Sequence, residues 1–164
     1  GVNLSTGSLG HGLPVGAGLA LAAKRSGATW HNFVILSDGE LDEGSNWEAV
    51  LFAAHHGLHN LTAIVDYNKL QGFGRTEEVL GLEPLADKWR AFGWALHEVD
   101  GNDISALQET LSSLPLSIDK PSVIIAHTVK GKGVSFMEDS LDWHYKTPNE
   151  TQLREALAEI EGEV

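Results

Sequence analysis

Cysteine is absent from this chain of 164 residues, and basic residues are few. Without cysteine the protein can form no disulfide or thiolate metal site and can use no cysteine nucleophile. The 11 Lys and Arg side chains face 23 Asp and Glu side chains, which gives a formal net charge of −12 at pH 7. Such a charge repels nucleic acid and anionic membranes, and no basic stripe offsets it, so neither is an expected partner.

Long apolar runs are also missing. No run approaches the roughly 18 residues that a membrane span requires, and the sequence opens at Gly1 with neither a methionine nor a signal-peptide pattern. Hydrophobic residues make up 42% of the chain, and a domain of this length buries about 70% of its unfolded surface. We therefore expect one cytoplasmic domain over residues 1–164, which is either a fragment or a subunit.

Short apolar runs alternate with amphipathic segments along the chain. Such runs predict buried strands, at residues 33–36, 61–65, 94–99 and 122–126. Helices are expected at 14–26, at 85–92 and behind a cap at Asp103. This alternation predicts an α/β fold with an open, mostly parallel, twisted sheet and helices on both faces.

Two further helices are predicted from capping boxes. Ser45 and Glu48 form the first box, and its helix should bury an apolar face made of Trp47, Val50, Leu51, Ala54 and Leu58. Thr147 and Glu150 form the second, and its helix should bury a stripe made of Leu153, Ala156, Leu157 and Ile160. Residues 71–84 contain several glycines and no apolar period, so they predict a loop beyond the sheet.

The first two predicted strands each end in a residue that suits a metal. Asp38 follows the first strand and Asn68 the second, and a right-handed crossover brings both to the carboxyl edge of one sheet. The Asp38 carboxylate, the Asn68 amide oxygen and the Leu70 carbonyl are hard oxygen donors of the kind that hold Mg²⁺ or Ca²⁺. Three donors leave room for phosphate oxygens, and Gly39 would let a ligand approach the backbone. The alternative is that these residues only form turns.

Two competing motifs fit less well. Residues 38–42 alternate acidic side chains as in a calcium-binding loop, but Glu43 stands where a glycine is required and Ala49 where a glutamate is required. The glycine-rich residues 1–18 resemble a dinucleotide fingerprint, but no strand precedes them.

Residues 38–44 and 66–71 closely resemble the transketolase family. They hold Asp-Gly, about thirty residues and then Asn, with a strand before each part, which is the thiamine diphosphate signature. Ser37 stands where the family usually has glycine, and we expect it to keep a negative φ. Residues 6–12, Thr-Gly-Ser-Leu-Gly-His-Gly, are very similar to the Thr-Gly-x-Leu-Gly-x-Gly loop of transketolases.

The resemblance covers nearly the whole chain and implies roles for particular residues. Cofactor contacts are implied at Gly7, Ser8, Leu9, Gly39, Asn68 and His144. His144 matches a family histidine that reaches the diphosphate and the substrate, and it is the expected catalytic residue because an imidazole both donates to phosphate and moves a proton near neutral pH. The alternative is a histidine of a surface loop.

Other residues near these motifs carry weaker expectations. His11 stands where the family usually has glutamine, so we expect a loop or packing residue. Lys130 and Lys132 lie among glycines after the fourth strand, where they either approach phosphate or remain solvated. Glu43 aligns with a family glutamate near the subunit contact, which implies an interface role.

By this resemblance, the chain is the diphosphate-binding part of an enzyme that moves a two-carbon ketol unit between sugar phosphates with thiamine diphosphate and Mg²⁺. The family's amino-terminal part and its pyrimidine-binding domain are not in the sequence. The resemblance therefore implies a pyrimidine-binding partner, a homo- or hetero-oligomer, an exposed apolar face and no turnover by the chain alone. The alternatives are another thiamine diphosphate enzyme, such as a dehydrogenase or synthase, and a non-catalytic binding remnant of the same fold.

Overall fold

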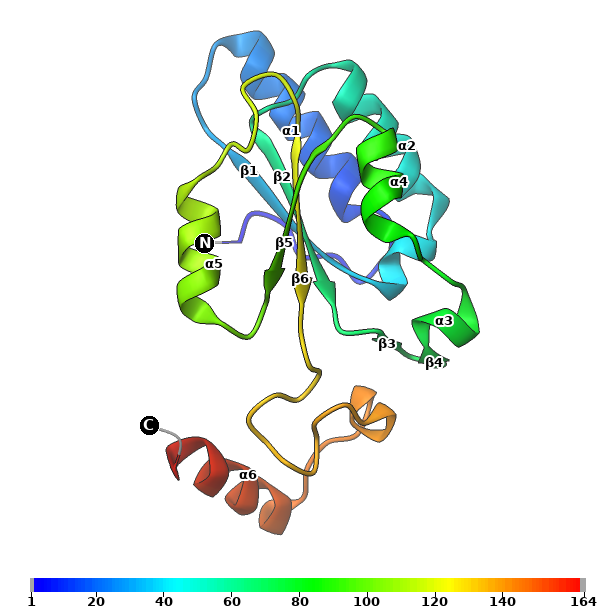
Figure 1. Ribbon diagram of the computed structural model, residues 1–164, viewed down its shortest axis with the longest axis vertical. Helices are drawn as coiled ribbons and strands as arrows, with labels where there is room; N and C mark the ends of the chain where they lie inside the picture. Colours follow the sequence, from blue (N-terminus) through cyan, green and yellow to red (C-terminus); the bar gives the residue numbers. More distant parts are fainter. Residues whose placement is uncertain (1, 163–164) are drawn as a thin grey trace.

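The computed structural model describes residues 2–162 and contains a four-stranded parallel sheet (Figure 1). Its strand order is β1-β2-β6-β5, with bounds Asn32–Ser37, Leu61–Tyr67, Ser122–His127 and Ala95–Asp100. All four predicted strands are confirmed. The register pairs Ser37 with Asp66 and Tyr67 with His127, so the carboxyl ends of the strands meet at one edge, as the sequence predicted.

Three helices cover one face of the sheet and form the main core (Figure 1). They are α1 (Gly12–Ser26), α2 (Gly44–His55) and α4 (Leu85–Ala91). Small residues let α1 approach the sheet closely: a Cβ on Gly16 would lie 2.4 Å from a methyl carbon of Val34. Trp89 of α4 is fully buried, so this face is closed.

The other face is only half covered. Helix α5 (Ile104–Ser112) begins at the predicted cap, where the Asp103 carboxylate accepts a hydrogen bond from the Ala106 N–H at 3.1 Å. It packs over β5 and β6 through Leu107. Phe33 and Ile35 on β1 stay 54% and 74% exposed. The expected exposed apolar face is therefore present in the chain by itself.

The predicted loop at 71–84 is only partly correct. A small hairpin, β3 (Leu70–Gln71) and β4 (Gly74–Arg75), precedes the short helix α3 (Thr76–Val79). Gly74 has a φ of 147°, a conformation open mainly to glycine, and this glycine lets so short a hairpin turn. No helix within residues 2–162 is long and apolar enough to cross a membrane.

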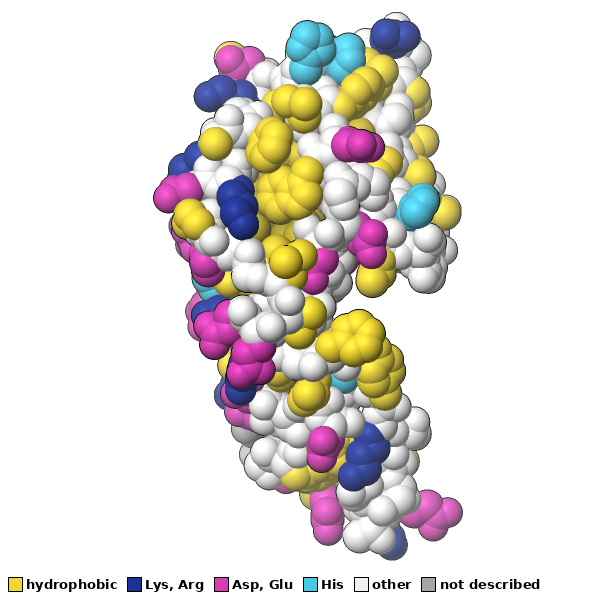
Figure 2. All heavy atoms as spheres, turned by 90° about the vertical axis from the view of Figure 1, so that its right-hand side faces the viewer, with side chains coloured by type: hydrophobic (Ala, Val, Ile, Leu, Met, Phe, Trp, Pro, Cys, Tyr) yellow, Lys and Arg dark blue, Asp and Glu magenta, His cyan; other side chains and the backbone are white. Residues whose placement is uncertain are grey.

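Beyond β6, residues 128–162 leave the sheet and form what we call the arm (Figure 1). The arm contains the 3-10 helix η2 (Leu141–His144) and the helix α6 (Glu150–Gly162). Figure 2 shows it below the remainder of the molecule, with a hollow between the two on this side.

The first predicted capping box is wrong. Glu43 precedes α2 without a side-chain cap, so Ser45 lies inside the first turn and its hydroxyl donates instead to the Gly10 carbonyl at 2.7 Å. Glu48 is exposed. The predicted apolar face is correct for Val50, which is buried, and for Trp47 and Ala54, which pack against the core. Leu58 is buried but lies beyond the end of α2 at His55, and Leu51 is 59% exposed.

The second capping box lies two residues later than predicted. The Asn149 amide oxygen accepts from the N–H groups of Thr151 and Gln152, and the Gln152 side chain accepts from the Asn149 N–H at 3.0 Å. Asn149 and Gln152 thus form the capping box that the sequence predicted for Thr147 and Glu150. Within the predicted buried stripe only Ala156 is buried, and the other three members are each 48% exposed, because nothing in the described chain packs over them.

Candidate functional site

Asp38 lies at the carboxyl edge of the sheet and joins two loops. It follows β1 and caps the 3-10 helix η1 (Gly39–Asp42), where its Oδ1 accepts from the Gly39 N–H at 2.7 Å. Its Oδ2 accepts from the Lys69 N–H at 2.5 Å, 31 residues away. The carboxylate therefore faces the loop after β2, as the predicted donor set requires.

The surroundings of Asp38 favour a bound cation. The residue is 1% exposed, and burial raises the pKa of its carboxyl group, although the two backbone N–H donors and the charge of Lys130 oppose that rise. Asp66 adds a like charge that also raises the pKa. A buried carboxylate with an acidic neighbour gains from a nearby positive charge.

Asn68 is held in place by the loop that contains it. Its Oδ1 accepts from the Leu70 N–H at 2.9 Å, and its Nδ2 donates to the Asp66 carboxylate at 3.2 Å. Lys69, which lies between Asn68 and Leu70 in the chain, has a φ of 66°. This value places its backbone in the left-handed region. This turn fixes the amide oxygen of Asn68 and the start of β3, where Leu70 lies, on the same side of the edge as Asp38.

Gly39 is required by packing inside the protein. A Cβ there would lie 2.8 Å from the Cβ of Gln71, so η1 and the β3–β4 hairpin approach closely. The Gln71 side chain also donates to the Asp42 carboxylate at 3.1 Å. The sequence predicted that Gly39 lets a ligand approach the backbone. The structure adds a second reason for a glycine, which is the close packing of η1 against Gln71.

The amino-terminal glycine loop is tied to the same edge through Gly10. The Gly10 N–H donates to the Glu40 carboxylate at 2.9 Å, and its carbonyl accepts from Ser45. Its φ is 81°, and a Cβ would lie 2.4 Å from the Ser45 hydroxyl. Sequence reasoning missed this function of Glu40, whose only signal is its place directly after the Asp-Gly turn.

The predicted cofactor contacts of this loop remain open to a ligand. Gly7, Ser8 and Leu9 are exposed and make no hydrogen bond to Asp38 or Asn68 within the described residues. His11 is exposed, and its Nδ1 lies 3.1 Å from the Ser8 hydroxyl, which confirms a loop residue.

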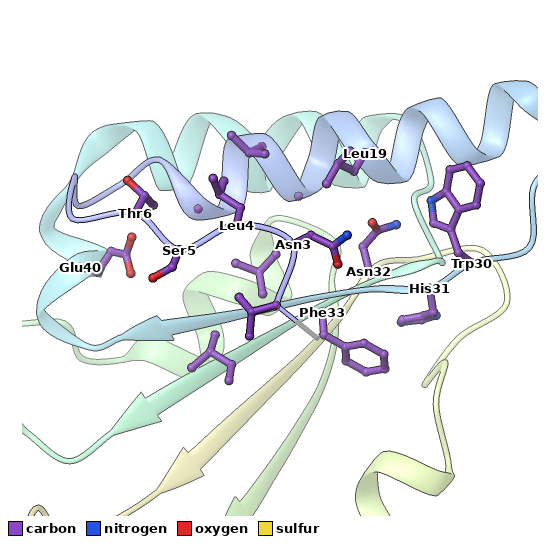
Figure 3. Close-up of a pocket in the computed structure, with 16 residues that line it drawn as sticks. Asn3, Leu4, Ser5, Thr6, Leu19, Trp30, His31, Asn32, Phe33 and Glu40 are labelled. Atoms are coloured by element: carbon purple, nitrogen blue, oxygen red, sulfur yellow. The ribbon is translucent and has the colours of Figure 1, made fainter.

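A groove of about 830 Å³ continues from this loop along β1. Figure 3 shows the segment with Leu4, Ser5 and Thr6 passing between α1 and β1, with Glu40 at one end of the groove and Trp30 at the other. The groove therefore ends next to the η1 turn that begins after Asp38.

His144 lies in η2, on the side of the edge where the hairpin is. Helix η2 contacts β3, and the His144 Nδ1 is buried without a hydrogen-bond partner within the described residues. Burial and the charge of Lys130 both lower the pKa of the imidazole, so it is neutral near pH 7. A neutral imidazole has one ring nitrogen that donates and one that accepts a hydrogen bond, and Nδ1 uses neither capacity within the described residues.

Lys130 is the cation common to both parts of the site. It lowers the pKa of Asp38 as well as that of His144, so its charge lies within electrostatic reach of the sheet edge and of the arm. Lys132 instead pairs with Glu138 at 3.2 Å. Of the two lysines that the sequence offered for phosphate, Lys130 is therefore the better placed.

Ser37 and Glu43 bear on two earlier expectations. Ser37 is the last residue of β1, and the non-glycine residues with positive φ in the described chain are Lys69 and Asp139. The predicted negative φ is confirmed, and the Ser37 hydroxyl accepts from the Glu40 N–H at 3.1 Å. Glu43 is exposed, and its interface role stays a prediction.

Comparison with known proteins identifies the family of the chain. The family described as "Transketolase, thiamine diphosphate binding domain" matches residues 1–159. The chain is 51% identical over 163 residues to one subunit of the apulose-4-phosphate transketolase from Actinobacillus succinogenes, covering 99% of this chain and 59% of that protein. It is 42% identical over 163 residues to a 6-deoxy-6-sulfo-D-fructose transketolase subunit from a Clostridium species, again covering 99% and 59%.

A solved structure confirms the fold. The transketolase from Campylobacter jejuni superimposes with a TM-score of 0.91 at 27% identity, over 98% of this chain and 26% of that one. The chain thus spans about three-fifths of the curated relatives it matches and about a quarter of this enzyme. From the family match, the identities and the fold together, the chain belongs to the thiamine diphosphate-binding domains of the transketolase family.

Proposed function

We propose that the chain is the diphosphate-binding part of a split transketolase that transfers a two-carbon ketol unit between sugar phosphates. The observation that carries this proposal is the hydrogen bond from the Lys69 N–H to the buried Asp38 carboxylate. It holds the Asp-Gly turn and the Asn loop against each other at one sheet edge, and that pair of loops is the thiamine diphosphate signature.

The donor set fits a divalent ion that bridges to a diphosphate. Asp38 brings the charge, Asn68 an amide oxygen and Leu70 a carbonyl, which are ligands that Mg²⁺ accepts, while Ca²⁺ is compatible with the same oxygens. The burial of Asp38 supports a cation at this place. Gly7, Ser8 and Leu9, on the exposed loop anchored by Gly10, are the proposed contacts to the thiamine part.

The bound cofactor would supply the stabilised carbanion on which ketol transfer depends. The residues of this chain hold and shield it. Asp38 and Asn68 would anchor the ion, Lys130 would add positive charge against the overall −12, and Gly39 would keep the turn close to the hairpin. His144, neutral near pH 7, would donate a hydrogen bond to the diphosphate or move a proton at the substrate.

A pyrimidine-binding partner chain is part of the proposal. The relative from Actinobacillus succinogenes is named as one subunit of its transketolase, and this chain leaves Phe33 and Ile35 exposed. Burying such apolar side chains at an interface is favourable. The two relatives are named for different sugars, so we assign the substrate class, phosphorylated or similarly anionic sugars, and not one sugar.

Calorimetry and a turnover assay test this function together. The chain should bind thiamine diphosphate in the presence of Mg²⁺ and bind it much more weakly in EDTA. With ketose and aldose phosphates it should show no turnover alone, and turnover should appear when its partner chain is added. Lack of Mg²⁺-dependent binding would favour a non-catalytic remnant, and turnover that follows the chain alone through purification would contradict the need for a partner.

A further inference from the structure

The arm is held together mainly by bonds within itself. The Glu159 carboxylate of α6 accepts from the N–H and the hydroxyl of Ser135 at 2.5 and 2.9 Å. The Asp139 N–H donates to the Lys130 carbonyl at 2.9 Å and closes the loop between them. Within residues 2–162, only the first residues of the arm are bonded to the sheet edge and to the loop after β5: the Thr128 hydroxyl donates to the Asp66 carboxylate, and the Val129 N–H donates to the Asn102 side chain at 2.8 Å. The part of the arm that contains η2 and α6 must therefore be positioned by other contacts.

One ion pair joins this part of the arm to the hairpin. The Arg75 guanidinium donates two parallel hydrogen bonds to the Asp139 carboxylate, both at 2.8 Å and across 64 residues of sequence. Of the ion pairs within residues 2–162, this is the one that links the arm to the remainder of the chain. A two-pronged guanidinium contact fixes direction as well as distance.

Tyr145 makes the neighbouring contact. A Cβ on Gly72 would lie 2.3 Å from the Tyr145 hydroxyl, so the tip of the hairpin packs directly on the residue after His144. The ion pair and this contact lie on either side of η2 in sequence, at positions 139 and 145. Together they fix where η2 sits.

Asp139 has an unusual backbone that suits this purpose. Its φ is 50°, in the left-handed region that aspartate and asparagine tolerate better than most residues. Such conformations persist where surrounding contacts determine them. Here one residue closes the loop to Lys130 through its N–H and grips Arg75 through its side chain.

We propose that Arg75 and Asp139 are positioning residues that set Lys130 and His144 over the edge formed by Asp38 and Asn68. Antiparallel pairing places Arg75 directly opposite Leu70, which carries the carbonyl assigned to the metal. The position of the guanidinium is therefore fixed relative to the proposed metal ligand. The ion pair with Asp139 in turn fixes the position of the arm relative to both. This assignment rests on the proposed function.

The exposure of the pair separates positioning from stability. The side chains of Arg75 and Asp139 are 41% and 54% exposed, and exposed ion pairs contribute little to global stability. Breaking this pair should therefore leave the melting temperature nearly unchanged. It should instead raise the population of arm positions in which His144 no longer faces the site.

The test compares Arg75→Gln, Asp139→Asn and Arg75→Lys in the full-length protein. Asn at position 139 tolerates the positive φ but removes the charge. Lys at position 75 keeps the charge but cannot donate the two parallel hydrogen bonds of the guanidinium. Arg90→Gln is the matched control, because Arg90 also makes an exposed ion pair, with Asp87 at 2.9 Å on α4. The measurements are hydrogen exchange of residues 139–146, the affinity for thiamine diphosphate with Mg²⁺, and kcat and KM in the presence of the partner chain.

We expect Arg75→Gln and Asp139→Asn to speed exchange in residues 139–146 and to weaken cofactor binding about two- to fivefold, with Arg75→Lys in between and Arg90→Gln unchanged. Unchanged exchange would overturn the proposal, and so would faster exchange with unchanged affinity, KM and kcat, since the pair would then be only structural. If the wild-type protein binds no thiamine diphosphate, the proposed function fails, while the exchange measurement still decides whether the pair holds the arm.

Discussion

The sheet edge and the arm are both assigned to one cofactor, yet they are held in place by different means. Asp38 is 1% exposed and is fixed by two backbone N–H groups. The arm beyond Val129 meets the hairpin through the exposed pair of Arg75 and Asp139 and through the contact of Tyr145 with Gly72. Buried bonds to backbone have few alternatives, whereas exposed ion pairs are readily replaced by water. The contacts of Asp38 are thus buried, whereas the contact that positions η2 is exposed to water.

Asp38→Asn should have the largest effect of any single change. It keeps the size but removes the charge, and its single acceptor oxygen can keep only one of the two backbone hydrogen bonds that Asp38 accepts. Loss of an outer-shell partner alone commonly costs a metal site about 10–100-fold. We expect the Mg²⁺-dependent affinity for thiamine diphosphate to fall more than about 100-fold, as measured by calorimetry. Asp87→Asn, on the surface of α4, is the control, and Mg²⁺-dependent binding by Asp38→Asn at the wild-type level would show that the site is elsewhere.

Gly39→Ala tests whether the edge is as tightly packed as the distances indicate. The added methyl would lie 2.8 Å from the Gln71 Cβ, so we expect a loss of about 1–3 kcal/mol in the free energy of unfolding and weaker cofactor binding. Gln71→Gly in the same chain should restore part of both. Gly18→Ala, with no heavy atom within 4 Å of the new methyl, should instead stabilise α1 by up to about 1 kcal/mol.

His144→Ala tests the arm's contribution to binding. A hydrogen bond to a charged group is worth about 1.5–3 kcal/mol, so cofactor or substrate affinity should fall about tenfold or more. The melting temperature should stay nearly constant, because His144 lies outside both core clusters. His97→Ala, at an exposed histidine on β5, is the control. A large drop in melting temperature with intact binding would make His144 a packing residue.

The smallest expected effect is a pH dependence of stability. The pKa of His144 is lowered by burial and by Lys130, so its contribution to stability is complete above the unfolded value of about 6.5 and is lost as the pH falls through the folded pKa. In His144→Gln, the melting temperature should decline less over this window. Burial also lowers the pKa of His31. The His31→Gln variant should therefore still show the part of the pH-dependent decline in melting temperature that is due to His144.

The same contrast explains what the sequence could predict. The strands are buried apolar runs, and the Asp38 and Asn68 turns follow them directly, so short windows contain the necessary information. The groups that tie these turns together are backbone N–H donors, which every residue except proline supplies, so a sequence pattern does not reveal the bond from Lys69 to Asp38.

The arm was harder to predict because its bonds join distant residues. Arg75 and Asp139 lie 64 positions apart, and neither belongs to a recognisable pattern. The stripe on α6 has the right period for burial, but period alone does not say whether a partner covers it. The two misplaced caps have a similar origin. The Ser45 hydroxyl donates to the distant Gly10 carbonyl instead of capping α2, and Asn149 caps α6 in place of Thr147.

The most direct test of the central claim is to locate the divalent ion. A crystal of the chain with thiamine diphosphate and Mn²⁺ in place of Mg²⁺ would give an anomalous signal at the metal. We predict one peak within about 2.3 Å of the Asp38 carboxylate, the Asn68 amide oxygen and the Leu70 carbonyl oxygen. A cofactor bound with its metal peak away from Asp38 would contradict the account.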